Sequence, residues 1–162
     1  MSNQTQTTRV ASQGEREIVT ERVFDAPREK VFQAFTDPKL IPHWWGPRGV
    51  TTTVEKMDVR VGGDWRFTCD GPDGATAFRG TYREITPFEL VEQTFEWEGM
   101  PGHIVVERAE FEDLGGGRTK LRTRSLFHTT EERDGMLASG MEGGLTESYE
   151  RLDELLAARS ED

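Results

Sequence analysis

The stretch from Arg22 to Pro47, which reads RVFDAPREKVFQAFTDPKLIPHWWGP, shows how the fold begins. A strand-like run with β-branched residues ends just before Pro27, which suits the first turn of a helix because its missing N–H would have no partner there. The Asp-Pro dipeptide at 37–38 repeats this start signal for a shorter helix. The stretch therefore predicts one strand followed at once by helices near 28–35 and 38–44.

Further strand-like runs recur along the chain, each separated from the next by a short segment that contains glycine or proline. Such separators are typical of hairpin connections, so the runs predict an antiparallel meander. Together with the first strand, the expected runs lie at about 15–24, 51–59, 64–70, 76–85, 89–97, 103–112 and 118–127.

The last segment, from about 130 to 158, shows helical periodicity, and we expect a break in the helix near Gly135. Thr129 and Glu132 fit a capping box at its start. One arc of the helix is mainly apolar and the remaining face is acidic, which predicts an amphipathic helix laid across a sheet. The arc comprises Leu137, Met141, Gly144, Leu145, Ser148, Leu152, Leu155 and Leu156.

The length of 162 residues predicts one folded domain, at 15–158. Residues 1–14 are rich in Gln, Thr and Ser without apolar periodicity, which predicts a disordered N-terminal tail, and 159–162 form a C-terminal tail. No segment approaches the roughly 20 apolar residues that cross a bilayer, and the start of the chain lacks the apolar stretch of a signal peptide. We therefore expect a cytoplasmic protein.

The charge of the chain excludes two classes of partner. The formal net charge is −10, and Lys and Arg are scattered among Asp and Glu. Nucleic acids and anionic membranes both require clustered positive charge. We therefore expect no nucleic-acid partner and no membrane partner, while a homodimer stays open.

No metal or cofactor is expected from the reactive side chains. Cys69 is the only cysteine, so it cannot form an intrachain disulfide or a thiolate cluster and is expected to be a small buried residue. His43, His103 and His128 lie far apart, without the spacing of zinc ligands. The chain also lacks a nucleophile elbow and a phosphate-binding loop.

Alternation along the strands assigns one face of the sheet to the interior. Glu92 and Glu96 mark the outside of their strand, which places Val91, Gln93, Phe95 and Trp97 inside. The same alternation groups further side chains on the inner face: Trp65, Phe67, Cys69, Phe78, Tyr82, Leu121, Thr123, Ser125 and Phe127. In the run near 103–112, Glu107 shares this parity with Ala109 and so points inward.

The C-terminal helix contains glycines at 140, 143 and 144, each costing about 1 kcal/mol relative to Ala in a helix interior. Close helix–sheet packing or a local break would explain them. Alternatively, Gly144 and Ser148 leave empty volume facing the aromatic side of the sheet. The residues alone leave both explanations open.

Several motifs spread over most of the chain carry a family resemblance. They are Trp44-Trp45-Gly46-Pro47, Gly62-Gly63 before Trp65-Arg66-Phe67, Gly80-Thr81-Tyr82, Gly115-Gly116-Gly117 and Ser148-Tyr149-Glu150-Arg151-Leu152. In their order and spacing the chain resembles the START-like (SRPBCC) superfamily, in the branch related to the activator of the ninety-kilodalton heat-shock protein ATPase. The resemblance implies an α+β helix-grip fold: a curved antiparallel sheet of about six or seven strands wrapped on a long C-terminal helix, with a cavity between them.

The function implied first is the binding of a small apolar or aromatic ligand in that cavity. The expected lining residues are Trp45, Phe67, Phe78, Tyr82, Phe95, Trp97, Glu107, Met141, Gly144, Leu145 and Ser148. START-like relatives include cyclases and aromatases, so a second hypothesis is an enzyme with Glu107, Tyr82 or Arg22 as the acid–base group. A third is a co-chaperone that stimulates the heat-shock ATPase.

Overall fold

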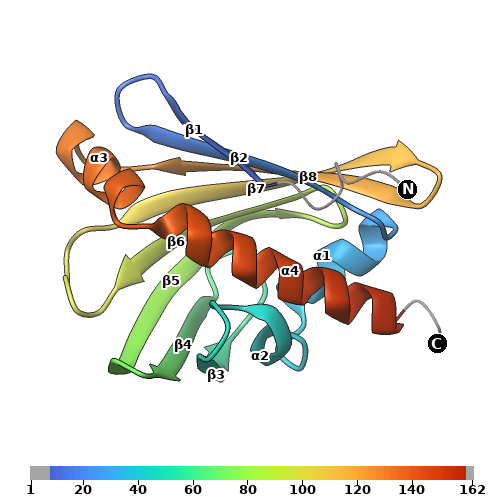
Figure 1. Cartoon of the computed structure of the whole chain (residues 1–162), viewed down its shortest axis with the longest axis horizontal. Coiled ribbons are helices and arrows are strands. Elements are labelled where there is room, and N and C mark those ends of the chain that lie inside the picture. The colour runs from blue at the N-terminus through green and yellow to red at the C-terminus, as the bar shows by residue number, and fades with distance from the viewer. Residues whose placement is uncertain (1–7, 160–162) are drawn as a thin grey trace.

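The computed structural model describes residues 8–159 (Figure 1). The elements in chain order are β1 (Arg9–Gln13), β2 (Glu17–Phe24), α1 (Arg28–Thr36), α2 (Ile41–Trp44), β3 (Thr51–Met57), β4 (Asp64–Gly71), β5 (Gly74–Thr86), β6 (Leu90–Trp97), β7 (Val105–Gly115), β8 (Arg118–Leu126), α3 (Thr130–Ala138) and α4 (Met141–Arg159). None of these helices is both long and apolar enough to span a membrane.

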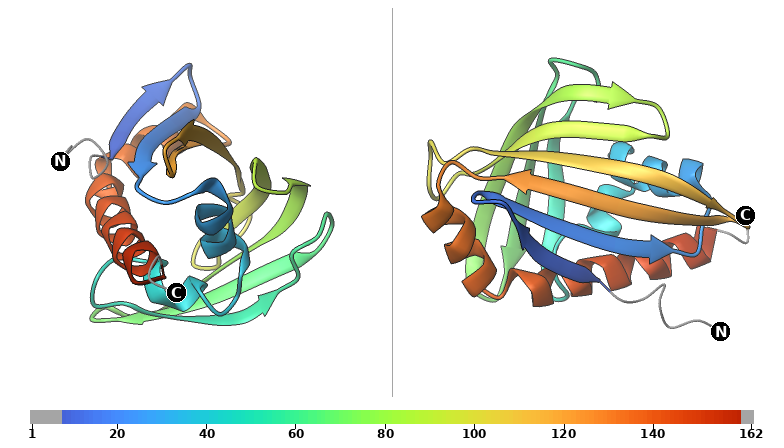
Figure 2. Two further views of the ribbon diagram at one scale, coloured as in Figure 1. Left: turned by 90° about the vertical axis from the view of Figure 1, so that its right-hand side faces the viewer. Right: turned by 90° about the horizontal axis from the view of Figure 1, so that it is seen from above.

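The strands form one antiparallel sheet in the order β1-β2-β8-β7-β6-β5-β4-β3. From β3 to β8 every strand pairs with its neighbour along the chain, as the short connections predict. The sheet is strongly curved, and α4 lies along its open side, with α1 inside the curve (Figure 2). The expected α+β helix-grip fold is confirmed.

The sheet has eight strands, whereas six or seven were expected. The difference arises because all of residues 1–14 were predicted to be a disordered tail, and this prediction is wrong for part of the segment. Arg9–Gln13 forms β1 and pairs along its length with β2, from Arg9 opposite Glu21 to Gln13 opposite Glu17. Most of its side chains are exposed, so the backbone pairing leaves no apolar pattern in the sequence. Residues 1–7 and 160–162 lie outside the described part of the chain.

The C-terminal helical segment is broken at a different residue from the one expected. Gly135 lies inside α3, and the chain turns between α3 and α4 at Gly140, whose φ of +85° is a conformation that glycine adopts readily. The expected cap at the start of α3 is confirmed, because the Thr129 side chain accepts a hydrogen bond from the Glu132 N–H. The break lets α4 cross the sheet in a different direction from α3 (Figure 1).

Side chains from α1 and the C-terminal half of α4 fill one end of the curved sheet. Phe32 is buried, and its ring packs edge to face on Phe111 at 5.3 Å between ring centroids. Leu152 and Leu156 of α4 are buried in the same core. The N-terminal half of α4 has no comparable row of buried leucines, and this is where the interior is hollow.

Candidate functional site

A cavity of about 480 Å³ lies between the concave face of the sheet and the N-terminal half of α4. Most of the surface around it is apolar. It is bordered by α1, α2 and the loop after α2 as well as by β2 and β4–β8. Residues that are far apart in the sequence therefore share one internal space.

Nearly all the residues that were predicted to line the cavity border it. Those that border it are Trp45, Phe67, Phe78, Tyr82, Phe95, Glu107, Met141, Gly144, Leu145 and Ser148. A β-carbon built on Gly144 would meet no atom within 4 Å beyond its own helix and chain neighbours. The open space at Gly144 therefore supports the second explanation for the glycines, in which the missing side chain leaves empty volume between the helix and the sheet.

Trp97 does not line the cavity, so this part of the prediction is wrong. It pairs across the strands with Phe78 and so lies on the expected face of the sheet. However, it is the last residue of β6 and its side chain is 42% exposed. Its indole N–H donates to the Thr76 hydroxyl instead. Strand alternation gave the correct face, but the end of the strand is more exposed than its middle.

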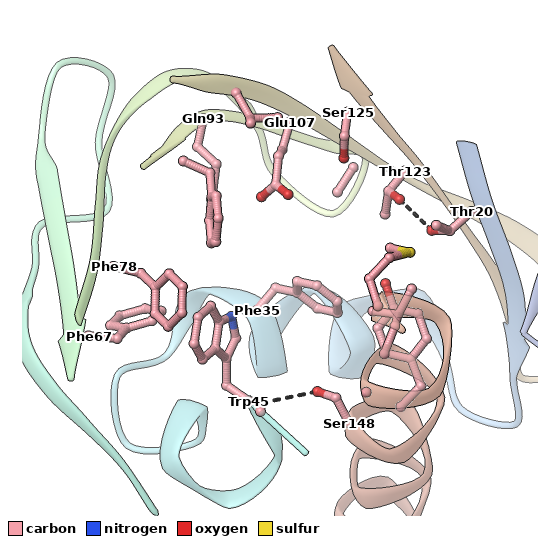
Figure 3. A pocket seen from close by; sticks show the side chains of 18 of the residues that line it. Thr20, Phe35, Trp45, Phe67, Phe78, Gln93, Glu107, Thr123, Ser125 and Ser148 are labelled. Atoms are coloured by element: carbon pink, nitrogen blue, oxygen red, sulfur yellow. Dashed lines mark hydrogen bonds between the residues drawn. The ribbon is translucent and has the colours of Figure 1, made fainter. Parts of the chain in front are cut away.

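The aromatic end of the cavity is built around Trp45. Its ring packs edge to face on Phe67 at 5.2 Å and on Phe78 at 5.4 Å between centroids. Phe78 stacks in turn on Phe95 at 5.2 Å. Figure 3 shows Trp45 reaching from below toward Phe67 and Phe78 on the sheet. These rings form an apolar wall.

Hydrogen bonds from α4 and β3 hold the loop that carries Trp45. The Ser148 hydroxyl donates to the Trp44 carbonyl at 2.8 Å and accepts from the Gly46 N–H at 3.3 Å. Arg151 Nη1 donates to the Gly46 carbonyl at 2.8 Å, and the Thr52 hydroxyl donates to the Trp45 carbonyl at 2.6 Å. The Ser148 hydroxyl is thus engaged in fixing the loop, although Ser148 borders the cavity.

A row of polar side chains crosses the opposite wall, on the sheet. Gln93, Glu107 and Ser125 are cross-strand neighbours on β6, β7 and β8. Next to them, the hydroxyls of Thr20 and Thr123 form a hydrogen bond. In Figure 3 the Glu107 carboxylate points away from the sheet into the cavity. The predicted inward orientation of Glu107 is confirmed.

Glu107 is the titratable group whose environment matters most for chemistry in the cavity. Burial raises its pKa to about 7, and the Ser125 side chain acts in the opposite direction. The side chain keeps part of its accessible surface because it borders the hollow rather than packed atoms. Near neutral pH, the carboxyl is therefore divided between its charged and neutral forms.

Two other candidate acid–base groups have little capacity for proton transfer. Tyr82 borders the cavity, and burial raises the pKa of its hydroxyl, with Asp58 adding to the effect, so it stays neutral. Arg22, the third candidate acid–base group, does not border the cavity. It is only 1% exposed, and its Nη2 lies 2.5 Å from the Asp153 carboxylate. Its role is to tie β2 to α4.

The cysteine and histidines behave as structural or surface residues. Cys69 is buried as predicted and borders the cavity, and burial raises the pKa of its thiol while Thr52 acts the other way. The His103 Nδ1 lies 2.7 Å from the Glu132 carboxylate, a partner that the sequence did not reveal. Among residues 8–159, no group of three or more His, Cys, Asp or Glu side chains could hold a metal ion.

Several cavity residues were not among those predicted. Tyr149 of α4 is the most prominent, buried beside Ser148 and four positions after Leu145, a spacing that could have indicated it. Thr20 was missed because a threonine within a strand-like run resembles an ordinary strand residue. Its place on the inner face follows from alternation with Ile18.

A model of the family described as Activator of Hsp90 ATPase homolog 1-like protein matches residues 25–157. No match is found among curated proteins. A solved structure from Rhodobacter sphaeroides is similar, with a TM-score of 0.86 and 26% identity, over 94% of this chain and 99% of that chain. One from Arthrobacter aurescens has a TM-score of 0.84 and 25% identity, over 93% and 91%. The AHSA1 protein from Silicibacter pomeroyi, at 21% identity and a TM-score of 0.71 over 88% and 99%, shares the fold.

Proposed function

The chain belongs to the family of activator of Hsp90 ATPase homolog 1-like proteins, and we propose that this member binds a small apolar or aromatic ligand in the cavity beneath α4. The cavity itself, at about 480 Å³ and lined mainly by apolar side chains, is the observation that carries the proposal. Cavities of about 300–1,000 Å³ with mostly apolar walls and a few polar groups are typical binding sites for drug-sized molecules.

The two walls suggest how a ligand would lie. A planar or compact apolar group would pack against the rings of Trp45, Phe67 and Phe78. A polar substituent would then reach Gln93 and Glu107 on the sheet. This arrangement favours a molecule with one apolar body and one polar end.

Binding is favoured over catalysis because the candidate acid–base groups do not form a working set. Arg22 is committed to Asp153 outside the cavity, and burial keeps Tyr82 neutral. Glu107 remains, with Ser125 as its hydrogen-bonding neighbour and no ion pair among residues 8–159. Among the three candidates it has no complementary acid or base with which to form a catalytic pair.

The family description refers to activation of a heat-shock ATPase, which remains the competing function. Such an activity would depend on the outer surface of the protein, whereas the feature that carries our proposal is internal. The net charge of −10 supports a protein that binds neither nucleic acid nor anionic membranes. Addition of the protein to an Hsp90-type ATPase assay should leave the rate of ATP hydrolysis unchanged.

The binding proposal can be tested first by native mass spectrometry of the purified protein, which should reveal a retained small molecule. A second test is titration with 1-decanol, which is transparent in the near ultraviolet, while tryptophan fluorescence is recorded. The change should saturate, and calorimetry should give the negative heat-capacity change of apolar burial. Trp45→Phe should remove most of the fluorescence change, whereas the control Trp97→Phe should retain it. A linear, unsaturable response in all three proteins would refute binding in the cavity.

A further inference from the structure

Glu107 is a carboxylate in an apolar cavity without a counter-charge from the protein. Among residues 8–159, it takes part in no ion pair, and Arg108 is the single Lys, Arg or His that borders the cavity. The Arg108 guanidinium is engaged on the other side of the sheet, with Nη1 at 3.3 Å from both the Glu84 and the Glu92 carboxylates. The charge that could face a ligand is therefore negative or zero.

The other groups that border this space are neutral hydrogen-bonding groups. Gln93 and Ser125 flank Glu107 on the neighbouring strands. From α4, Tyr149 faces the same region, and burial raises the pKa of its hydroxyl, an effect that Thr20 opposes and Glu107 strengthens. The remaining titratable lining groups, Tyr82 on β5 and Cys69 on β4, are also held neutral by burial. Outside the lining, the Arg22–Asp153 pair joins β2 to α4.

Building on the proposed function, we propose that the cavity selects an apolar or aromatic ligand that carries a protonated amine, whose N–H group donates to the Glu107 carboxylate. An isolated carboxylate in an apolar space is costly, and a ligand ammonium would supply the missing counter-charge. The rings of Trp45 and Phe95 add surfaces that favour a cation over an anion. A ligand carboxylate would meet Glu107 with no cation to compensate it.

The position of Glu107 gives the selection a pH dependence. Since the pKa of Glu107 is about 7, a proton competes with the ligand ammonium at lower pH. The affinity for an amine should therefore rise by up to about tenfold per pH unit below pH 7 and level off above it. The affinity for a neutral ligand of the same shape should not follow this curve.

The experiment compares three probes that share one ring system: 2-naphthylmethanol, 2-naphthylmethylamine and 2-naphthoate. Calorimetric titrations at several pH values between 5.5 and 8 would give their dissociation constants. At pH 8 the amine should bind roughly ten- to a hundredfold more tightly than the alcohol, as expected of a charge-assisted hydrogen bond, and naphthoate should bind most weakly.

Glu107→Gln keeps the shape of the side chain and removes its charge. In this variant the preference for the amine over 2-naphthylmethanol and its pH dependence should both disappear. The matched control is Glu112→Gln, an equal change of charge at an exposed position of the same strand, which should preserve the preference.

The outcomes distinguish a failure of the proposed amine selectivity from a failure of ligand binding itself. If the alcohol binds saturably but the amine has no advantage, the inference is wrong and the binding function stands. If none of the probes binds, the binding function fails and the inference fails with it. Should Glu107→Gln not fold, the pH profile of amine binding by the unaltered protein decides, because a flat profile would overturn the role of Glu107.

Discussion

Replacement of Gly144 by leucine should fill the cavity from the helix side. Gly144 borders the hollow, and a β-carbon placed there meets no atom within 4 Å beyond its own helix and chain neighbours. The substitution also removes a glycine from the first turn of α4. Both effects act in the direction of a more stable protein, whereas ligand binding should be lost because the added side chain occupies the same space.

The size of the effect follows from three contributions. Removing the glycine stabilises the helix by about 0.8 kcal/mol, and burying a leucine side chain contributes up to about 1.5–3 kcal/mol. The loss of leucine rotamer freedom opposes this by about 0.5–1 kcal/mol. The free energy of unfolding should therefore increase by about 1–3 kcal/mol, and the Tm of a domain of this size rises by about 2–4 °C for each kcal/mol.

The assay is thermal unfolding followed by circular dichroism, together with calorimetric titration of 2-naphthylmethanol. Gly143→Leu is the matched control, because Gly143 is the preceding residue, is exposed and does not border the cavity. It should show the helix contribution alone and retain ligand binding. If the space is in fact filled, overpacking should lower the stability of Gly144→Leu by about 1–3 kcal/mol. A decrease in Tm for Gly144→Leu, but not for Gly143→Leu, would refute the reasoning.

Two further predictions concern the packing around a glycine of the sheet and the protonation of Glu107. Gly80→Ala should destabilise the protein by about 1–3 kcal/mol in urea unfolding, because its β-carbon would lie 1.9 Å from the Thr94 carbonyl oxygen and 2.5 Å from the Trp65 indole nitrogen. The control Gly135→Ala should be neutral or slightly stabilising, because a β-carbon there would meet no atom within 4 Å beyond its own helix and chain neighbours. A similar loss of stability in both variants would contradict the close packing around Gly80. Burial shifts the Glu107 pKa from its ordinary 4.5 to about 7, so the folded state holds a proton that the unfolded state releases. Counting Glu107 alone, the free energy of unfolding should fall by about 3 kcal/mol between pH 4.5 and 7, and a Glu107→Gln profile with the same slope would exclude this assignment.

The inner face of the sheet and the amphipathic helix could be predicted because burial leaves a period in the sequence. Glu92 and Glu96 define the outer face of β6, and the inner face then contains Gln93 and Phe95, both of which border the cavity. The same alternation correctly turned Glu107 inward. The period carries this information because a strand slipped by one residue would place every one of these side chains in the wrong environment.

The features that could not be predicted depend on tertiary context. β1 is held by backbone hydrogen bonds at the edge of the sheet, and its mostly exposed side chains carry no period. Trp97 has the right parity, but periodicity does not tell where the covering helix ends. The helix breaks at Gly140 and not at Gly135 because only one of these glycines adopts a positive φ, a choice made by the path of the chain.

The motifs that carry the family resemblance and the side chains that would choose a ligand are largely different residues. Trp44-Trp45-Gly46-Pro47 and Ser148-Tyr149-Glu150-Arg151-Leu152 meet in the fold, where Ser148 and Arg151 hydrogen-bond to the loop after α2. These contacts build the frame of the cavity and fix Trp45. Glu107 lies outside both motifs, on a strand facing them. The motifs therefore account for the frame of the cavity and not for its polar wall, so they predict a cavity but not its ligand, and substitutions at Glu107 are the sharper test of function.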